Sequence, residues 1–385
     1  MKLALLGPGR IADIVAQALV ATPEIECYAV ASRNRERAEA FAEKFGFQKA
    51  YGSYEEMLSD PEVQLVYITT PHSHHFEQMM LCLEYGKNVI CEKAFTINAD
   101  QARKVFAKAK EKGLYVAEAI WTRYMPSRKI IQDIIDSGII GDVVGANCAM
   151  VCHGHETWHP DPEFYYKRGG GPMLDMGPYY ITALVQLLGE AKAVSGMTKK
   201  SFTQRVITSE PHSGEIIDVD VDTYLAGNIL FSSGAIAQVF TTFDVYYAPS
   251  AQARFEVYGT RGTLVVPDPN TFGGPLLLLR PEDQAASKTD PALDQHTVPS
   301  FYKGYKEIPL MYDYAENSRA LGLADMGKAL RTGRDFRANY QQQHHVLEIL
   351  TAFSKASEAG TFIPMETKYE RTAPMENNPI HGILD

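Results

Sequence analysis

The segment Gly7-Pro8-Gly9-Arg10-Ile11-Ala12 constrains what this chain can fold into more than any other part of its sequence. It follows the apolar run of residues 3–6 and precedes a segment in which apolar residues recur at helical spacing. In a GxGxxG/A motif the first glycine permits a tight turn, the second lets a pyrophosphate approach the backbone, and a small sixth residue lets helix and strand pack closely. The pattern predicts a dinucleotide-binding strand and helix. The alternative is a glycine-rich turn that binds nothing.

The rest of the first third alternates apolar runs with helical patterns. The runs lie at residues 3–7, 28–32, 64–70, 88–91 and 114–118. Strands that alternate with helices in this way indicate βαβ units and a parallel sheet. We therefore predict an α/β protein whose residues 1–121 form a Rossmann domain with a doubly wound parallel sheet.

Beyond a helix expected near residues 127–137, the pattern changes to longer alternating strands. We expect these strands at 143–151, 194–200, 223–231, 235–243 and 253–258, and helices at 173–188, 314–331 and 341–359. Residues 281–305 are rich in Pro, Asp, Lys and Gln and suggest a surface excursion. Residues 122–385 are therefore predicted to form a C-terminal α+β domain with a mostly antiparallel open sheet, which binds substrate and mediates oligomerisation.

Composition restricts the partners and the compartment of the chain. Its 37 basic and 47 acidic residues give a net charge of -10, which argues against an extended nucleic-acid or anionic-membrane surface. No run approaches the roughly 18 apolar residues of a membrane span. The 5 cysteines follow no disulfide framework and suit reduced thiols. We therefore expect a cytoplasmic protein that binds neither nucleic acid nor membrane.

The end of the second expected strand bears on cofactor choice. An NAD-specific fold usually places Asp or Glu there to hold the ribose hydroxyls, but this chain has Ser32-Arg33-Asn34. A guanidinium suits a 2′-phosphate, which a carboxylate would repel. We therefore predict a preference for NADP, with NAD as the possible alternative. The competing interpretation is a solvated arginine at a helix start.

Several further segments resemble the glucose-fructose oxidoreductase, inositol dehydrogenase and rhizopine-catabolism (Gfo/Idh/MocA) family. They are GPGRIA at 7–12, TPHSHH at 70–75, CEKA at 91–94, EAIWTRYMP at 118–126, GGGPMLDMGPYY at 169–180, ENSRALGLADM at 316–326 and HHVLEIL at 344–350. The WTRYMP and DMGPYY stretches are most similar to the dihydrodiol and xylose dehydrogenase branch. The resemblance implies a two-domain fold, an open sheet commonly used for dimerisation and substrate bound between the domains at the nicotinamide. We accordingly expect a homodimer or homotetramer.

The resemblance also implies the catalytic residues. The lysine of the family's EKP motif is Lys93 here, followed by Ala94 in place of the proline. Asp175 matches the aspartate of the GGGxxxD segment, and Tyr179 stands where many members have histidine. Asp175 and Tyr179 are four residues apart, which puts both on one face of the expected helix, where the carboxylate can orient Lys93. We predict Lys93 as proton donor or acceptor, Tyr179 as its partner and Asp175 as the positioning residue.

Unperturbed Lys and Tyr are both poor bases at neutral pH. A lysine desolvated beside a cationic nicotinamide should have a lowered pKa, and the lysine charge should lower the pKa of the tyrosine. The alternative for Tyr179 is a packed core aromatic, and for Lys93 a surface lysine.

The remaining candidates surround these three residues. Trp121, Arg123 and Tyr124 follow the fifth strand, where a doubly wound sheet opens its ligand crevice. The predicted cofactor-binding residues are Gly7, Gly9, Arg10, Ile11, Ser32, Arg33, Thr70, Pro71, His72, His75, Glu92, Lys93, Trp121 and Arg123. The predicted substrate-binding residues are Lys93, Tyr124, His155, Trp158, Asp175 and Tyr179.

The segment Cys152-His153-Gly154-His155-Glu156-Thr157-Trp158-His159 contains residue types that bind zinc. A strand would put His153 and His155 on one face, but no second cluster supplies a closing pair of ligands. We therefore predict no metal site. By the family resemblance, this segment is a loop or strand end over the substrate pocket.

Together these features predict an NAD(P)-dependent dehydrogenase or reductase acting on CH-OH groups, which transfers a hydride between nicotinamide and a sugar, cyclic polyol or related carbonyl. Two alternatives belong to other classes. One is a redox-neutral enzyme that retains NAD(H) and oxidises a glycoside transiently. The other is a dinucleotide-binding regulator without catalysis.

Overall fold

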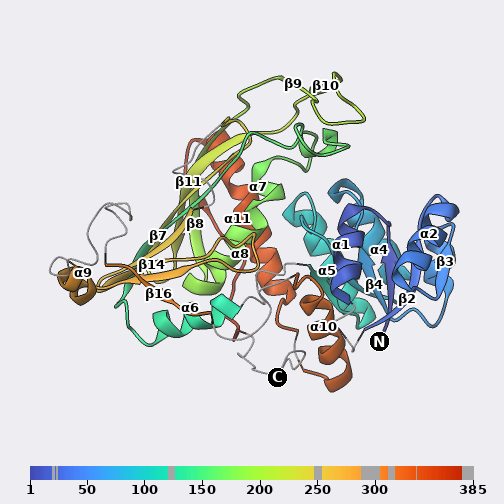
Figure 1. Ribbon diagram of the computed structural model, residues 1–385, viewed down its shortest axis with the longest axis horizontal. Helices are drawn as coiled ribbons and strands as arrows, with labels where there is room; N and C mark the ends of the chain where they lie inside the picture. The colour runs from blue at the N-terminus through green and yellow to red at the C-terminus, as the bar shows by residue number, and fades with distance from the viewer. Residues whose placement is uncertain are drawn as a thin grey trace.

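The amino-terminal part of the chain forms a parallel sheet with helices on both faces. The computed structural model describes residues 1–19, 22, 25–119, 126–246, 254–287, 304–310, 317–334 and 336–374. Six parallel strands lie in the order β3-β2-β1-β4-β5-β6, which is the order of a Rossmann fold. Their bounds are β1 Lys2–Leu6, β2 Glu26–Ala31, β3 Lys49–Tyr51, β4 Leu65–Ile68, β5 Asn88–Cys91 and β6 Val116–Glu118. This sheet stands at the right of Figure 1.

The central strands of this sheet, β4 and β1 after its first residue, are continuously apolar because both of their faces are buried. Alternate residues of β1 enter two different cores: Leu3 and Leu5 pack on one side, and Ala4 and Leu6 on the other. Helices α1 (Arg10–Leu19) and α2 (Arg35–Phe45) cover the first side. The second side is covered by α3 Tyr54–Ser59, α4 His75–Glu84 and α5 Ala99–Lys112.

Helix α10 (Leu321–Thr332) belongs by sequence to the carboxyl-terminal part but returns to the first sheet. Its residues Leu323 and Met326 join the core formed by α1 and β1. The sequence predicts a helix at 314–331, but α10 begins only at Leu321. Residues 311–316 lie outside the described part. A division of the chain at residue 121 stays a prediction.

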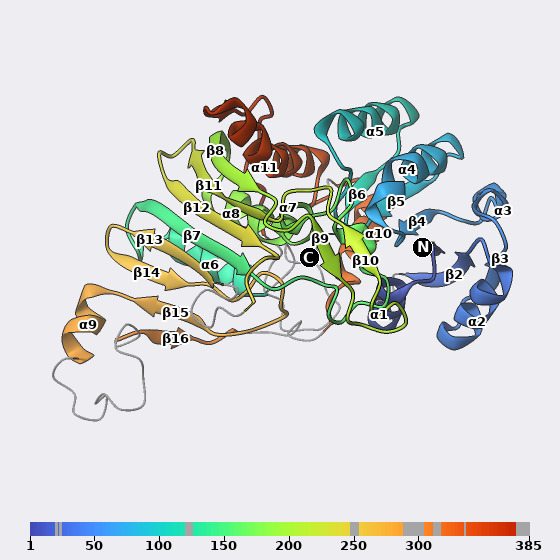
Figure 2. The ribbon, with the colours of Figure 1, turned by 90° about the horizontal axis from the view of Figure 1, so that it is seen from above.

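The second sheet has nine strands in the order β16-β15-β14-β13-β7-β12-β11-β8-β17. Only the β7–β12 pair among these neighbours is parallel, so the expectation of a mostly antiparallel sheet is confirmed. Figure 2 shows the strands from β8 to β16 laid out in succession. The strands of the sheet are β7 Val143–Val151, β8 Ala191–Lys199, β11 Tyr224–Phe231, β12 Ile236–Thr242, β13 Arg254–Gly259, β14 Gly262–Val265, β15 Leu276–Leu279, β16 Lys306–Ile308 and β17 Ile363–Pro364.

Helices α8 (Gly177–Leu188) and α11 (Tyr340–Ala359) pack against this sheet, and α6 (Pro126–Asp136) packs against α8. Helix α11 also contacts α5 of the first domain. A separate pair of strands, β9 (Gln204–Val206) and β10 (Ile216–Asp218), was not expected from the sequence. The excursion expected at 281–305 begins with helix α9 (Pro281–Ser287), and residues 288–303 lie outside the described part. None of the described helices is long and apolar enough to cross a membrane.

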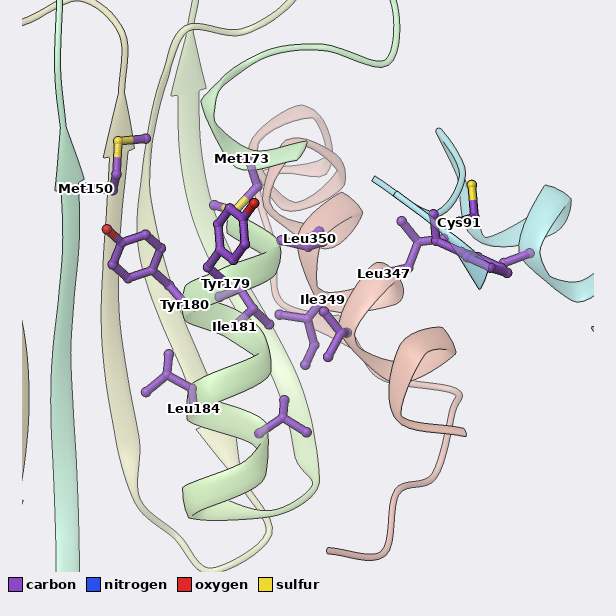
Figure 3. Close-up of a cluster of buried hydrophobic side chains, with 14 of the residues drawn as sticks. Cys91, Met150, Met173, Tyr179, Tyr180, Ile181, Leu184, Leu347, Ile349 and Leu350 are labelled. Atoms are coloured by element: carbon purple, nitrogen blue, oxygen red, sulfur yellow. The ribbon is translucent and has the colours of Figure 1, made fainter. Parts of the chain in front are cut away.

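The single helix expected at 173–188 is two helices. Helix α7 (Pro172–Asp175) ends before Met176, and α8 begins at Gly177. The break has a physical reason, because Pro178 lacks the N–H that a continuous helix would need at that position and is tolerated in the first turn of a new one. Figure 3 shows Tyr180 turned toward Met150 on the sheet and Tyr179 beside Met173.

Candidate active site

The turn after β1 has the shape that a pyrophosphate site needs. Gly7 has φ +96°, and a Cβ there would lie 2.6 Å from Thr70 Cγ2, so a side chain does not fit. A Cβ on Gly9 would meet no described atom within 4 Å, which leaves open space directly over the start of α1. The Thr69 hydroxyl donates to the Gly7 carbonyl at 2.6 Å and fixes the turn against β4. Backbone and helix N-terminus therefore fit a dinucleotide phosphate.

The residues after β2 leave a guanidinium facing solvent. Ser32 is buried, and its hydroxyl accepts a hydrogen bond from the Asn34 N–H at 3.2 Å. Arg33 is exposed and makes no hydrogen bond or ion pair with the residues that the structure describes. Arg37, which sequence reasoning missed, donates to the Pro8 carbonyl at 3.3 Å and so stands beside the glycine turn. Its position in the first turn of α2 was the only available signal.

Three predicted catalytic side chains meet beyond the carboxyl end of β5. The ammonium of Lys93 forms an ion pair and hydrogen bond with Asp175 Oδ1, and it lies 5.7 Å from the ring centroid of Tyr179. The other carboxylate oxygen of Asp175 lies 2.7 Å from Nε2 of His155. The peptide bond between Lys93 and Ala94 is cis. Although a helix break separates Asp175 from Tyr179, both approach Lys93.

The electrostatics of this group differ from the sequence expectation. Burial alone would lower the pKa of Lys93, but Asp175 outweighs it and raises that pKa above its ordinary value. Burial would raise the pKa of Asp175, yet Lys93 and the hydrogen bond from His155 hold it well below its usual range. Burial raises the pKa of Tyr179 despite the nearby Lys93. The lowered pKa expected for Tyr179 is therefore not found, because burial outweighs the effect of the lysine charge, whereas the lowering expected for Lys93 beside a cationic nicotinamide stays a prediction.

Two of the predicted cofactor-binding residues, His75 and Glu92, are buried beneath the loops that form the site. His75 is fully buried, and its ring nitrogens lie 2.8 Å from the carbonyl oxygens of Thr70 and Ala94. Burial lowers the pKa of His75 to about 4. Glu92 is also buried, accepts a hydrogen bond from the Lys93 N–H at 3.3 Å and is bonded to Tyr67. His75 and Glu92 therefore hold the main chain around Lys93 in place from its buried side.

The segment after β7 is a loop that reaches the first domain. The Trp158 ring lies 4.9 Å from the guanidinium of Arg10, at the start of α1. His72 packs against Phe164, with 5.6 Å between ring centroids. A Cβ on Gly169, which has φ +92°, would lie 2.4 Å from Ile97 Cγ2, so only glycine permits this approach. The loop therefore contacts both the start of α1 and the Lys93 group.

The metal interpretation of this loop finds no support in the geometry. Because β7 ends at Val151, His153 and His155 lie on a loop rather than on one face of a strand. His153 packs against Tyr246, whereas His155 contacts Asp175. Within the described ranges, no group of three or more His, Cys, Asp or Glu side chains is arranged to hold a metal ion.

A buried ion-pair network holds the loop that follows β7 in place. Arg205 on β9 is paired with Glu156 at 2.8 Å and with Asp244 at 2.5 Å, and all three side chains are nearly inaccessible. Arg205 also donates to the carbonyls of His153 and Phe243 at 3.0 and 2.9 Å. Sequence reasoning missed this network, since its members are far apart in the chain and carry no motif.

We expect Arg205→Met to lower the free energy of unfolding by about 3–5 kcal/mol, because it leaves Glu156 and Asp244 buried without their cation. Urea titration followed by circular dichroism measures this. Arg35→Met is the matched control, since Arg35 pairs with Glu39 in a largely exposed i,i+4 bridge and should cost at most about 1 kcal/mol. Equal losses in the two variants would contradict the structural role of Arg205.

Three predicted residues, Trp121, Arg123 and Tyr124, lie outside the described part of the chain. A further residue joins the site from residues 164–168, which the sequence offers as either an edge of the pocket or a solvated face. The Tyr165 ring lies 4.1 Å from that of His155, between centroids, and Tyr165 interacts electrostatically with Lys93 and Asp175. Its place in the aromatic run 164–166 was the only sequence signal.

Comparison with known proteins agrees with this fold. Residues 1–119 match the family model described as "Oxidoreductase family, NAD-binding Rossmann fold", and residues 129–265 match that of the GFO/IDH/MocA C-terminal domain. A D-xylose 1-dehydrogenase (NADP(+)) of Hypocrea jecorina is 36% identical in a match 291 residues long, which covers 63% of this chain and 73% of that protein. The trans-1,2-dihydrobenzene-1,2-diol dehydrogenase of Mus musculus is 37% identical over 194 residues, which are 50% of this chain but only 57% of the mouse enzyme.

Solved structures share the whole fold. A levoglucosan dehydrogenase in complex with NADH and L-sorbose superposes with a TM-score of 0.77 at 21% identity, covering 95% of this chain and 99% of that one. An NAD binding oxidoreductase from Klebsiella pneumoniae has a TM-score of 0.75 at 22% identity, covering 94% and 98%. At such low identity these structures establish the two-domain architecture alone.

Proposed function

The chain belongs to the Gfo/Idh/MocA oxidoreductase family, and on this basis we propose that it is an NADP-preferring dehydrogenase or reductase. Its substrate is a CH-OH group of a sugar or cyclic polyol, or the corresponding carbonyl. The observation that carries the proposal is the meeting of Lys93, Asp175 and Tyr179 beyond the parallel sheet, beside a turn that fits a pyrophosphate. The names of the Hypocrea and mouse relatives support the substrate class.

Each side chain has a distinct task in this proposal. A bound nicotinamide supplies or accepts the hydride. Because Asp175 raises the pKa of Lys93, the amine is an ammonium at neutral pH and is suited to donate a proton to the oxygen of a carbonyl under reduction. In the oxidation direction the free amine form of Lys93, which is present on the alkaline side, accepts the hydroxyl proton. Tyr179 is the partner of Lys93 in relaying the proton, and Asp175 holds the amine in place.

The walls of the site suit a cyclic substrate. Trp158, Tyr165 and Phe164 form a chain of ring contacts with His155 and His159. Such rings offer flat apolar surfaces to the CH face of a sugar, while Lys93 and Asp175 offer hydrogen bonds to its hydroxyls. We propose Trp158 and Tyr165 as substrate contacts, together with the predicted residue Tyr124.

A substrate screen tests the proposal. The purified protein is incubated with NADP or NAD and a panel of sugars, polyols, trans-diols and glycosides, and with NADPH and the matching carbonyls. The near-ultraviolet absorbance of reduced nicotinamide is followed. We expect a net absorbance change with at least one cyclic polyol or sugar. Product without a net change would indicate the redox-neutral alternative, and cofactor binding without any product would indicate a regulator.

Arg33→Ala should raise KM for NADP by roughly ten- to a hundredfold, because a hydrogen bond to a charged group contributes about 1.5–3 kcal/mol. KM for NAD, which lacks the 2′-phosphate, should stay within about twofold. Arg35→Ala is the control, since Arg35 is paired with Glu39 and carries the same charge two residues away. Steady-state kinetics with both cofactors measure the selectivity, and an unchanged NADP/NAD ratio in Arg33→Ala would refute the assignment.

We also propose that the chain assembles through the open face of the second sheet. This face presents Met197 and Ile236, which are 81% and 51% exposed, and a hollow of about 740 Å³ lined by residues that include Phe240 and Phe362. Light scattering coupled to size exclusion tests for a homodimer or homotetramer. The five unpaired cysteines favour a reducing compartment, and we propose the cytoplasm.

A further inference from the structure

The carboxylate of Asp175 is held from two sides. Lys93 occupies one oxygen, and His155 Nε2 lies 2.7 Å from the other. Lys93, Asp175 and His155 have side chains that are only 18%, 7% and 11% exposed. We propose that His155 is a positioning residue, which fixes the Asp175 carboxylate so that its remaining oxygen faces Lys93. This inference rests on the proposed function, because it gives His155 a task in the same proton transfer.

The surroundings of His155 leave it little else to contact. Its ring centroid lies 4.1 Å from that of Tyr165, 4.8 Å from Phe243 and 5.2 Å from Trp158. Its Nδ1 is buried and has no hydrogen-bond partner among the described residues. A carboxylate only accepts hydrogen bonds, so the proton of a neutral imidazole belongs on Nε2. Aromatic contacts thus cage the ring, and its one side-chain hydrogen bond goes to Asp175.

The main chain at His155 is clamped in turn. The His155 N–H donates to the hydroxyl of Tyr166 at 3.3 Å. The carbonyl of Glu156 accepts from the N–H groups of Thr208 and Ser209 at 2.9 and 3.1 Å, and its side chain is paired with Arg205. A ring placed by so many fixed contacts can hold a carboxylate to a small range of orientations, which is the condition for efficient proton transfer.

Kinetics of two variants test the role. His155→Phe keeps an aromatic ring in the cage but removes the N–H, and we expect kcat to fall roughly ten- to a hundredfold while the Kd of NADPH stays unchanged. His155→Gln restores a donor near the position of Nε2 and should recover most of the loss. A kcat of His155→Phe equal to that of the wild type would overturn the proposal, and so would equal losses in the two variants.

The pH dependence of kcat/KM provides a second test, because a general loss of stability would not shift the pH of its acidic limb. Removal of the His155 donor raises the pKa of Asp175, so the acidic limb of kcat/KM should move to higher pH in His155→Phe. In His155→Gln the limb should stay where it is in the wild type. A limb that shifts equally in His155→Gln and His155→Phe would overturn the proposal. The other groups that act on Asp175 electrostatically are Lys93, Tyr179, Tyr165, His72 and Cys152.

A measurement without turnover separates this inference from the proposed function. Long-range ¹H–¹⁵N spectra report the tautomer of each histidine ring, and the signals of His155 are those lost in His155→Gln. We expect the Nε2–H form in the wild type and a loss of that preference in Asp175→Ala. An Nδ1–H form in the wild type would refute the pairing. If no substrate is turned over while the Nε2–H form is found, the proposed function fails and the pairing stands.

Discussion

Lys93→Met should lower kcat by about a thousandfold in both directions, while the Kd of NADPH changes by less than about threefold. The reason is that Lys93 is the only amine in contact with Asp175 among the described residues, and it reaches the site from the end of β5. Methionine has a similar length but cannot move a proton. Stopped-flow absorbance measures the hydride step, and fluorescence titration measures cofactor binding.

A second substitution separates proton transfer from charge. Lys93→Arg keeps a cation beside Asp175, but the guanidinium does not lose its proton at any accessible pH. If Lys93 transfers a proton, the arginine variant should be nearly as slow as the methionine variant. If the charge alone mattered, the arginine variant should recover most of kcat. Wild-type rates in Lys93→Met with bound cofactor would refute the catalytic assignment altogether.

The pKa of Lys93 also sets the pH dependence of the two directions. A raised pKa keeps the ammonium present up to alkaline pH. Carbonyl reduction, which uses the protonated amine, should therefore be flat through neutral pH and fall only on the alkaline side. Alcohol oxidation, which uses the free amine, should rise over the same alkaline range.

The parts of the fold that the sequence predicted correctly are those coded by neighbouring residues. The turn at Gly7 and Gly9 adjoins its own strand and helix, and in β12 (Ile236–Thr242) exposed and buried residues alternate over the first four positions, as expected for a sheet with one buried face. Lys93 and Asp175 were found through short motifs. In all these cases the pattern and its structural consequence lie within a dozen residues.

The parts that could not be predicted depend on contacts between distant segments. Arg205 pairs with Glu156, 49 residues away, and His155 meets Asp175 across 20 residues. Hydrophobic periodicity reports which positions are buried but not which charge faces which. The return of α10 to the first sheet is likewise a tertiary event, since an apolar helix face does not specify the sheet it covers. The break at Met176 does have a local signal in Gly177-Pro178, but the helical spacing of the apolar residues on both sides continues across it.

Asp175 connects these two kinds of information. Its motif identified it as a candidate, whereas only the structure showed that it contacts Lys93 and His155 together. The ammonium is stabilised by Asp175 against the effect of its own burial. The pKa of Lys93, and hence the pH range of each direction, therefore depends on the carboxylate more than on the depth of the site.

Asp175→Asn should accordingly lower kcat for reduction by about a hundredfold and move its alkaline limb to lower pH. Without the negative charge, burial acts against the ammonium with less opposition, so the pKa of Lys93 falls and the proton donor is lost at lower pH. The alkaline rise of oxidation should shift in the same direction, because the free amine appears sooner. Rate profiles from neutral to alkaline pH measure both limbs.

The control for this substitution lies on the other side of α8. Asp268→Asn makes the same change at a half-buried carboxylate, whose Oδ1 accepts a hydrogen bond from Tyr180 at 2.8 Å and which, within the described part of the chain, makes no hydrogen bond or ion pair with Lys93. It should leave both pH limbs in place even if it lowers stability. A limb that moves equally in both variants would show that loosening of α8, rather than the charge of Asp175, controls Lys93. A shift confined to Asp175→Asn, with NADPH binding intact, would establish that this carboxylate sets the protonation of the catalytic amine.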